Sequence, residues 1–242
     1  MKAIVIKNAK TVKEPAYIDV LYPALYKNKK NARFLDDSRV QTLLTCGLYK
    51  TILEDVLEDI GTNSSVLQVG CTFGPQIEQT ADKVGRYGKY VIVDVLDSEL
   101  DRVREKLIDK KIDFELHDAR KPFSGAYDTV ICWMLLHELP DVSREKVINN
   151  ILSAVKDGGR AIFIDYNRPS DFNLLRFLLK PFNRLFFPFA ENLWNTPIKN
   201  YAHKDSHFSW YKKTYGGKLY QKVVAVRRVS DAIKPVTKQS FY

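Results

Sequence analysis

The stretch "SSVLQVGCTFGPQ", residues 64–76, decides the fold that we predict for this chain. Its apolar residues indicate a buried strand that ends at Gly70, and a second glycine follows at Gly74. Small residues after a strand let backbone N–H groups approach a ligand, and the following helix offers its N-terminus. The stretch therefore resembles a nucleotide-binding loop in an α/β sheet.

Two residues depart from the usual form of such a loop. Gln68 stands where an acidic residue is usual, and Thr72 stands where a middle glycine is usual. The loop is thus a decayed binding loop, a loop adapted to different chemistry, or only a strand and a turn. The rest of the chain has to decide among these three interpretations.

Strand and helix patterns alternate after this loop. Strands are expected at residues 66–69, 90–95, 112–116, 128–133 and 161–164, and helices at 75–84, 98–108 and 142–155. Near-continuous apolar strands separated by helices are typical of a parallel sheet buried on both faces. Residues 210–215 and 219–228 predict a closing antiparallel hairpin. The predicted fold is α/β, a mostly parallel seven-stranded sheet with helices on both faces.

The boundaries of the predicted parts follow from the same patterns. Apolar residues at helical spacing predict an N-terminal helical cover over residues 1–60, with one apolar face between Val40 and Ile60. Asp97 or Ser98 is expected to cap the helix at 98–108, and Gly158-Gly159 is expected to form a turn. The main domain is expected over 61–229, with an insertion at 169–207 and a polar tail at 230–242.

Composition and charge limit the classes of function. The net charge is +9, and the segment from Arg168 to Arg228 holds twelve Lys or Arg against three Asp or Glu. This excess suits nucleic acid, an anionic membrane surface or an acidic ligand. The three cysteines form no C-x-x-C pair, and no apolar stretch has the length of a signal peptide or a membrane span. We therefore expect a cytoplasmic protein.

The carboxyl ends of the predicted strands are the expected ligand site, because doubly wound sheets bind ligands there. Asp94 ends the second strand and can accept hydrogen bonds from ribose hydroxyls; Asp118 and Ala119 follow the third and can read an adenine edge. Structural alternatives are a cap for Asp94, a salt bridge to Arg120 for Asp118 and a plain turn for the glycines. The predicted cofactor residues are Gln68, Gly70, Cys71, Thr72, Gly74, Asp94, Val95, Asp118, Ala119 and Trp133.

The glycine loop, Asp94 and Asp118-Ala119 follow one another along the chain, and "LLHELPD" (135–141) and "KDGGRAIFIDY" (156–166) come after them. This order of motifs resembles the class I S-adenosylmethionine-dependent methyltransferase fold, which is Rossmann-like. The resemblance covers about residues 60–170, and the final hairpin fits that fold's last two strands. It implies S-adenosylmethionine as the cofactor. A nicotinamide-type Rossmann domain is the structural alternative, but its usual G-x-G-x-x-G is absent.

A narrower resemblance rests on "VLQVGCTFG", "LLHELPD", "FIDYNRP", "PFA" followed by "LW", and "GGKLYQKVVA", between about residues 64 and 226. These motifs resemble the rhodoquinone biosynthesis family, the RquA-type proteins. The resemblance implies replacement of a ubiquinone methoxy group by an amino group, with S-adenosylmethionine supplying the nitrogen and manganese implicated. Gln68 and Thr72 would then lie at the amino acid end of the cofactor; neutral drift is the alternative for Gln68.

Three residues near the ends of the fourth and fifth strands are the catalytic candidates. His137 could act as a general base or a metal ligand, or only as a cap or packing residue. Asp165 could bind a hard cation, and Tyr166 could orient a quinone carbonyl. No cluster has metal-ligand spacing, so the sequence identifies no metal residues. His203 and His207 are expected to be surface histidines.

The segment 170–194 interleaves leucines and aromatics with Arg176, Lys180 and Arg184. It predicts an interfacial lid that meets an anionic membrane surface, with a core-facing lid as the alternative. We expect peripheral association with the inner face of the cytoplasmic membrane and a lipophilic quinone substrate. No nucleic-acid-binding motif is present, so nucleic acid is not expected.

Three functions are compatible with the sequence. The first is the amino substitution on ubiquinone, and the second is a conventional methyltransferase acting on a quinone precursor or another lipophilic aromatic. The third is a non-enzymatic S-adenosylmethionine sensor or membrane-recruited partner. The first two share fold and cofactor and differ in the group transferred.

Overall fold

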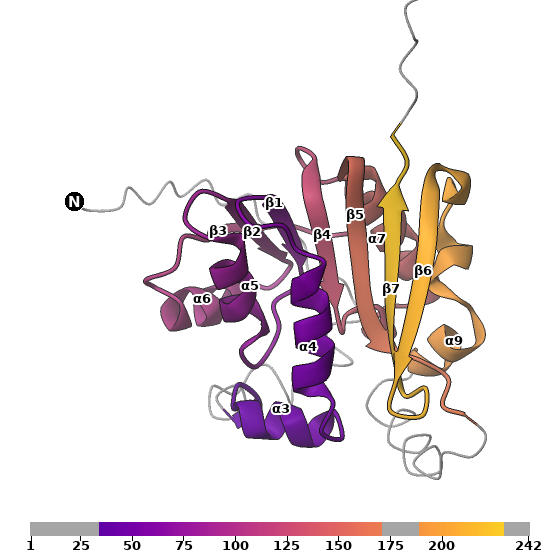
Figure 1. Cartoon of the computed structure of the whole chain (residues 1–242), viewed down its shortest axis with the longest axis horizontal. Coiled ribbons are helices and arrows are strands. Elements are labelled where there is room, and N and C mark those ends of the chain that lie inside the picture. Colours follow the sequence, from indigo (N-terminus) through magenta and orange to yellow (C-terminus); the bar gives the residue numbers. More distant parts are fainter. Residues whose placement is uncertain (1–33, 171–188, 230–242) are drawn as a thin grey trace, which may run out of the picture.

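A seven-stranded sheet forms the centre of the computed structural model, which describes residues 34–170 and 189–229 (Figure 1). The strand order is β3-β2-β1-β4-β5-β7-β6. Strands β1 to β5 pair in parallel, and β7 is antiparallel to both β5 and β6, which confirms the predicted fold and hairpin. The strands are β1 Ser65–Val69, β2 Lys89–Asp94, β3 Asp113–Leu116, β4 Tyr127–Trp133, β5 Val155–Tyr166, β6 Phe208–Tyr215 and β7 Tyr220–Arg227.

Helices cover both faces of the sheet, α4 on the near side of Figure 1 and α7 behind the strands. One apolar cluster joins the sheet to α4 (Tyr49–Glu58), α5 (Gln76–Val84) and α6 (Asp97–Lys106). The other joins it to α7 (Asp141–Ser153) and α9 (Ala190–Asn195). The shorter elements are α3 Ser38–Leu44 and the 3-10 helices η1 Leu136–Glu138, η2 Ile198–Tyr201 and η3 Asp205–His207. Because the strand order reverses between β1 and β4, their carboxyl ends border one crevice.

The N-terminal cover differs from the single apolar face expected between Val40 and Ile60. Cys46 and Gly47 have φ angles of 53° and 83°, so the chain turns there and separates α3 from α4. Ile52, Leu53 and Val56 of α4 are buried as predicted, whereas Leu43 and Leu44 of α3 are exposed. Residues 1–33 of the predicted cover lie outside the described residues.

Two local predictions are wrong. Gly158-Gly159 forms no turn between elements but belongs to β5, where the pairing with β4 shifts register between Tyr127 and Thr129. A Cβ on Gly159 would lie 2.8 Å from the Asp128 carbonyl oxygen, which explains the glycine. Helix α6 begins after Leu96 without a side-chain cap, and Asp97 is its first residue.

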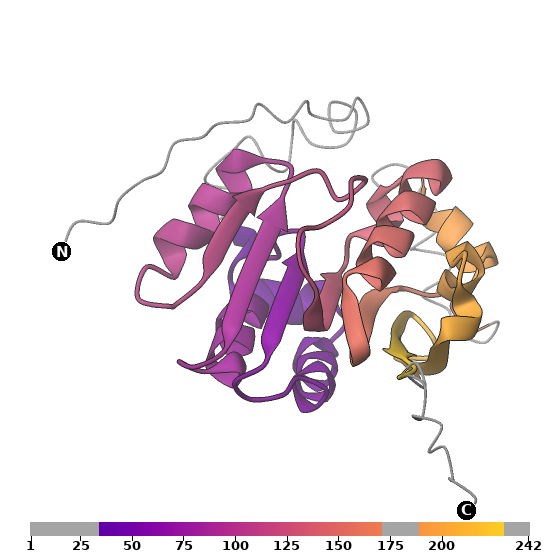
Figure 2. The same ribbon diagram turned by 90° about the horizontal axis from the view of Figure 1, so that it is seen from above.

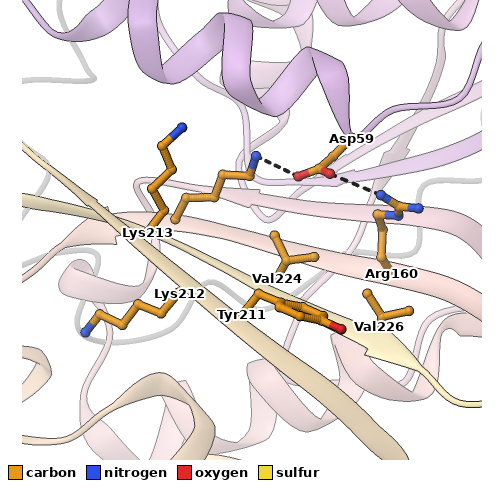
Figure 3. A pocket seen from close by; sticks show the side chains of 8 residues that line it. Asp59, Arg160, Tyr211, Lys212, Lys213, Val224 and Val226 are labelled. Atoms are coloured by element: carbon orange, nitrogen blue, oxygen red, sulfur yellow. Dashed lines mark hydrogen bonds and ion pairs between the residues drawn. The ribbon is translucent and has the colours of Figure 1, made fainter.

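A network of ion pairs attaches α4 to the sheet (Figure 3). Lys222 Nζ of β7 lies 3.1 Å from Asp55 Oδ1 and 2.6 Å from Asp59 Oδ2, and Asp59 Oδ1 lies 3.1 Å from Arg160 Nη1. Lys213 of the edge strand reaches Asp55 Oδ2 at 2.8 Å from outside. Both lysines pair with Asp55, but the Lys222 side chain is 8% exposed and that of Lys213 is 60% exposed. Replacing each in turn therefore compares a buried ion pair with an exposed one.

Replacing Lys222 should destabilise the fold more than replacing Lys213. Lys222→Ala leaves two carboxylates without their buried cation and should lower the free energy of unfolding by about 2 kcal/mol. Lys213→Ala removes a solvent-screened pair and should cost much less. Urea unfolding of both variants measures the difference; equal losses would contradict this account of the network.

Candidate functional site

A narrow cavity lies at the carboxyl ends of β1, β2 and β3, where the sequence places the cofactor. Five predicted residues line it together: Gly70, Asp94, Val95, Asp118 and Ala119. Leu135, Leu139 and Val147 close it from the side of η1 and α7. Its volume is about 50 Å³, below the roughly 150 Å³ of a cavity that admits benzene. An adenine ring therefore fits only after side chains at the rim move outward.

Asp94 holds the glycine loop against β2. Its Oδ2 accepts a hydrogen bond from the Cys71 backbone N–H at 2.7 Å, and its Oδ1 accepts one from the Leu96 N–H at 2.9 Å. Burial raises the pKa of the Asp94 carboxyl, against the lowering effect of these donors. Gly70 has a φ of 86° beside Leu135, a conformation that glycine adopts without strain. Asp94 therefore sets the shape of the loop that borders the cavity.

Asp118 lines the cavity and also forms the salt bridge considered as its alternative role. Arg120 Nε lies 2.9 Å from Asp118 Oδ1, and Nη2 lies 2.8 Å from Oδ2. The Arg120 backbone N–H donates to Oδ1 at 3.0 Å, which closes a tight turn. Burial would raise the pKa of Asp118, but the hydrogen bonds and charge of Arg120 lower it. Contact with an adenine edge stays a prediction, and it requires Arg120 to release or share the carboxylate.

Gln68 and Thr72 do not line the cavity. Side chains alternate along a strand, and Gln68 lies on the side that packs against α5. Gln76 Nε2 donates to Gln68 Oε1 at 3.2 Å and to Thr80 Oγ1 at 3.0 Å, while Thr72 Oγ1 donates to Gln76 Oε1 at 2.8 Å. Gln68 Nε2 donates to the Gly70 carbonyl at 3.3 Å. This uncharged, buried network supports the loop from below, and direct cofactor contact by either residue stays a prediction.

The outer end of the glycine loop packs against the chain that precedes it. The Gly74 N–H donates to Asp36 Oδ1 at 3.0 Å, and a Cβ on Gly74 would lie 2.8 Å from both Gln41 Cγ and Tyr49 Oη. Trp133 packs on the Tyr49 ring, with 5.9 Å between centroids, and is outside the cavity. Gly74 is thus a packing glycine here, and cofactor contact by Gly74, Cys71 and Trp133 is untested.

The three catalytic candidates come together at the ends of β4 and β5. His137 Nδ1 lies 2.9 Å from Asp165 Oδ1, and the rings of His137 and Tyr166 meet edge to face at 4.7 Å. Asp165 also accepts the N–H groups of Leu136 at 2.8 Å and His137 at 3.3 Å on Oδ2, and that of Tyr166 at 2.7 Å on Oδ1. These donors fill the carboxylate's acceptor positions.

The contacts of Asp165 bear on the prediction that it binds a hard cation. The carboxylate already accepts four N–H groups, and a cation role for it stays a prediction. The contact with the Asp165 carboxylate assigns the donor role to His137 Nδ1. The second ring nitrogen, Nε2, takes no part in this hydrogen bond. Asp165 therefore orients His137 and supports the loop that carries it.

Glu138 and Tyr166 complete the cluster around His137. Glu138 Oε1 lies 4.0 Å from His137 Nε2, and the Glu138 side chain is buried. Burial, and then the charge of Asp165, raise the pKa of the Glu138 carboxyl well above its ordinary value. Burial also raises the pKa of the Tyr166 hydroxyl, which therefore keeps its proton near neutral pH and can donate a hydrogen bond.

The structure gives less evidence on the expected metal, the membrane association and the surface histidines. Among residues 34–170 and 189–229, no three His, Cys, Asp or Glu side chains form a candidate metal group, so manganese gains no support there. No described helix is long and apolar enough to cross a bilayer. His203 is exposed and pairs with Glu145, as expected of a surface histidine. Most of the predicted interfacial lid, residues 171–188, lies outside the described residues.

A cavity of about 300 Å³ lies away from this crevice, between the end of α4 and strands β5 to β7 (Figure 3). None of the predicted site residues lines it. Arg160 and Lys222 in its wall both pair with Asp59. The larger hollow is therefore not the expected cofactor site.

Sequence reasoning missed Gln76 and Arg144. Gln76 and Thr80 lie one turn apart on the buried face of α5, a polar pair on an apolar stripe that could have indicated a network. Arg144 lies three and four residues before Val147 and Ile148 on the buried face of α7, and it is fully buried. A charged residue on such a stripe must find internal partners.

Comparison with known proteins supports the fold and the domain. Residues 66–159 match the family model described as Methyltransferase domain. The ubiquinone/menaquinone biosynthesis C-methyltransferase UbiE of Ectopseudomonas mendocina is 26% identical over 153 residues, which is 61% of this chain and 59% of that protein. UbiE of Pseudomonas aeruginosa is 29% identical over 141 residues, 55% of this chain and 54% of that protein. The chain thus spans less than two thirds of the length of these relatives.

Solved structures of low identity share the architecture. A SAM-dependent methyltransferase from Aquifex aeolicus aligns with a TM-score of 0.58 and 17% identity, over 83% of this chain and 98% of that one. The N-methyltransferase NodS from Bradyrhizobium japonicum, in complex with S-adenosyl-L-homocysteine, aligns at 0.56 and 12%, over 84% and 94%. The fold is therefore the class I, Rossmann-like methyltransferase fold.

The raised pKa of Glu138 gives a stability prediction. The folded state retains a proton that the unfolded chain releases above the ordinary pKa of 4.5, so this contribution to stability is complete below that pH and is lost as the pH rises toward the raised value. Glu138→Gln should therefore gain stability relative to the unmodified protein as the pH rises from 4 to 8.

Thermal melting of both proteins at several pH values measures this difference. Glu54→Gln, on the exposed side of α4, is the matched control. A difference between Glu138→Gln and the unmodified protein that stays constant with pH would show that burial does not hold the proton on Glu138.

Proposed function

We propose that this chain is an S-adenosylmethionine-dependent methyltransferase that methylates a lipophilic quinone or a quinone precursor. The observation that carries the proposal is the cavity shared by Gly70, Asp94, Val95, Asp118 and Ala119, at the strand ends of a methyltransferase domain. His137, Asp165 and Tyr166 lie together after the neighbouring strands. Cofactor residues and proton-handling residues therefore border the same edge of the sheet.

The cavity residues fit the cofactor's adenosyl part. Asp94 stands at the end of β2, where a carboxylate accepts hydrogen bonds from ribose hydroxyls, and Gly70 in the cavity wall has no side chain of its own. Asp118 and Ala119 would border the adenine. The rim must open by movement of Arg120, whose side chain is 31% exposed and pairs with Asp118.

The chemistry of the chain's own residues suits proton removal from a ring substrate. S-adenosylmethionine, when bound, supplies an electrophilic methyl group. Asp165 holds His137 through Nδ1–H, so that Nε2 can take the proton that a ring carbon or hydroxyl loses. Tyr166 keeps its proton and donates a hydrogen bond to a carbonyl oxygen of the ring.

The substrate class rests on two observations. The relatives that align over about 60% of the chain are quinone biosynthesis methyltransferases. The segment that follows β5 interleaves leucines and phenylalanines with Arg176, Lys180 and Arg184, a composition that suits collection of a water-insoluble substrate from an anionic membrane. We therefore place the protein at the inner face of the cytoplasmic membrane.

A second candidate is the amino substitution on ubiquinone, with the nitrogen taken from S-adenosylmethionine. The neutral Gln68–Gln76 network favours it, because the usual carboxylate is absent beneath the loop that would hold the cofactor's amino acid end. Manganese belongs to this candidate alone. A methyltransferase of ordinary chemistry requires only that the network keep the loop in shape.

The bound cofactor should depend on Asp94. Asp94→Ala removes both the ribose acceptor and the support of the Cys71 N–H, so the affinity for S-adenosylmethionine should fall at least about tenfold. Asp97→Ala changes an exposed carboxylate three residues along and should leave affinity unchanged. Isothermal titration calorimetry measures both; equal affinity of Asp94→Ala and the unmodified protein would place the cofactor elsewhere.

Isotope labels in the cofactor separate the two candidate reactions. The protein is incubated with quinone extracts in vesicles and S-adenosylmethionine labelled with ¹³C in the methyl group or ¹⁵N in the amino group. Methyl transfer predicts ¹³C in the quinone product, detected by mass spectrometry, and its loss in His137→Asn. Product that carries only ¹⁵N would replace our proposal by the amino substitution.

A further inference from the structure

Arg144 lies in the first turn of α7 with no exposed surface, although a guanidinium is costly to bury. Its Nε donates to the Leu136 carbonyl at 2.9 Å, and Nη2 donates to the carbonyls of Leu139 at 2.9 Å and Phe189 at 2.8 Å. Nη1 donates to Tyr201 Oη at 3.0 Å and to Asp141 Oδ1. All five N–H groups of the guanidinium are therefore engaged.

The acceptors belong to two different parts of the fold. Leu136 and Leu139 bracket His137 and Glu138, so Arg144 holds the carbonyl groups of the loop that carries His137. On the other side of this loop, Asp165 accepts the N–H groups of Leu136 and His137. Two buried groups of opposite charge thus fix the peptide groups of one short loop.

Asp141 belongs to α7 itself, and the other two acceptors lie in the segment that follows β5. Phe189 is the first described residue after 171–188 and precedes α9, and Tyr201 ends η2. Figure 2 shows α7 beside this orange segment, and hydrogen bonds from Asn149 Nδ2 to the Tyr201 carbonyl and from the His203 N–H to Asn149 Oδ1 also join them. Arg144 donates hydrogen bonds to both the α9–η2 segment and the His137 loop, on which α9 also packs directly.

We infer that Arg144 is a positioning residue that couples the docking of the α9–η2 segment to the placement of His137. One rigid guanidinium shares its donors between the two, so displacement of Phe189 or Tyr201 changes the hydrogen bonds available to Leu136 and Leu139. The α9–η2 segment therefore sets the orientation of the side chain that we propose accepts the proton. The effect of Arg144 on catalysis rests on the proposed function, whereas its effect on the position of His137 does not.

The experiment follows the imidazole nitrogens of His137 by NMR in the ¹⁵N-histidine-labelled full chain. The chain has four histidines, and His203 serves as an internal reference because it contacts Asn149 and not Arg144. Arg144→Lys keeps the charge and loses the fork. It should shift the His137 resonances and change their pH titration, and it should lower kcat for methyl transfer at least about tenfold with unchanged affinity for S-adenosylmethionine.

Asn149→Ala is the matched control, since it weakens the same α7–η2 contact without touching the His137 loop. It should move the His203 resonances and leave those of His137 in place. If Arg144→Lys folds poorly, Tyr201→Phe tests the coupling with the guanidinium retained, and it should shift His137 in the same direction by a smaller amount.

Unshifted His137 resonances in Arg144→Lys or in Tyr201→Phe would overturn the inference, as would an equal shift in Asn149→Ala. Its failure is distinguishable from failure of the proposed function. A protein that transfers no methyl group but shows the His137 shift in Arg144→Lys keeps the positioning role and loses only the assigned reaction.

Discussion

The structure depends on one arrangement that occurs twice: a carboxylate at the end of one strand accepts backbone N–H groups from the loop after a neighbouring strand. Asp94 at the end of β2 holds the loop after β1 through Cys71. Asp165 at the end of β5 holds the loop after β4 through Leu136 and His137. The N–H groups of a loop that leaves a parallel sheet need partners when they are buried. These two carboxylates supply them on either side of the crevice, so both walls of the site are shaped by the sheet itself.

Both loops are held by a carboxylate, but the other groups that pack beneath them differ in charge. Beneath the glycine loop, Gln68, Thr72 and Gln76 form an uncharged network that satisfies its own donors and acceptors. Around the His137 loop, buried charges of both signs meet, with Asp165 on the N–H side and Arg144 on the carbonyl side. Amide networks give shape without a field, whereas charged groups in a low-dielectric interior act on a nearby titratable ring. The second wall is the one suited to handling a proton.

The sheet could be predicted from the sequence alone, because the apolar strands, the helices between them and the final hairpin follow from the periodicity of apolar residues. It also placed Gly70, Asp94 and Asp118 at one cavity, since parallel strands end at a common edge. It could not show contacts between side chains and partners distant in sequence. The donors that hold Asp165 come from residues 28 and 29 positions away. The role of Arg144 was missed because its acceptors at Phe189 and Tyr201 follow from the packing of α9 and η2 on α7.

The glycine loop shows how far tertiary contacts change the interpretation of a motif. Gly74 has the φ of 82° expected of a binding-loop glycine, but its Cβ position faces Gln41 and Tyr49. The chain itself fills the space that the motif alone would leave to a ligand. The N-terminal segment therefore packs on the outer end of the loop, and Asp36, which binds the Gly74 N–H and Arg102, holds it in place. Thr72 in place of a middle glycine is consistent with this arrangement, because its hydroxyl is turned to Gln76 beneath the loop. The departures in the motif are thus accounted for by support of the loop, before any difference in the group transferred is considered.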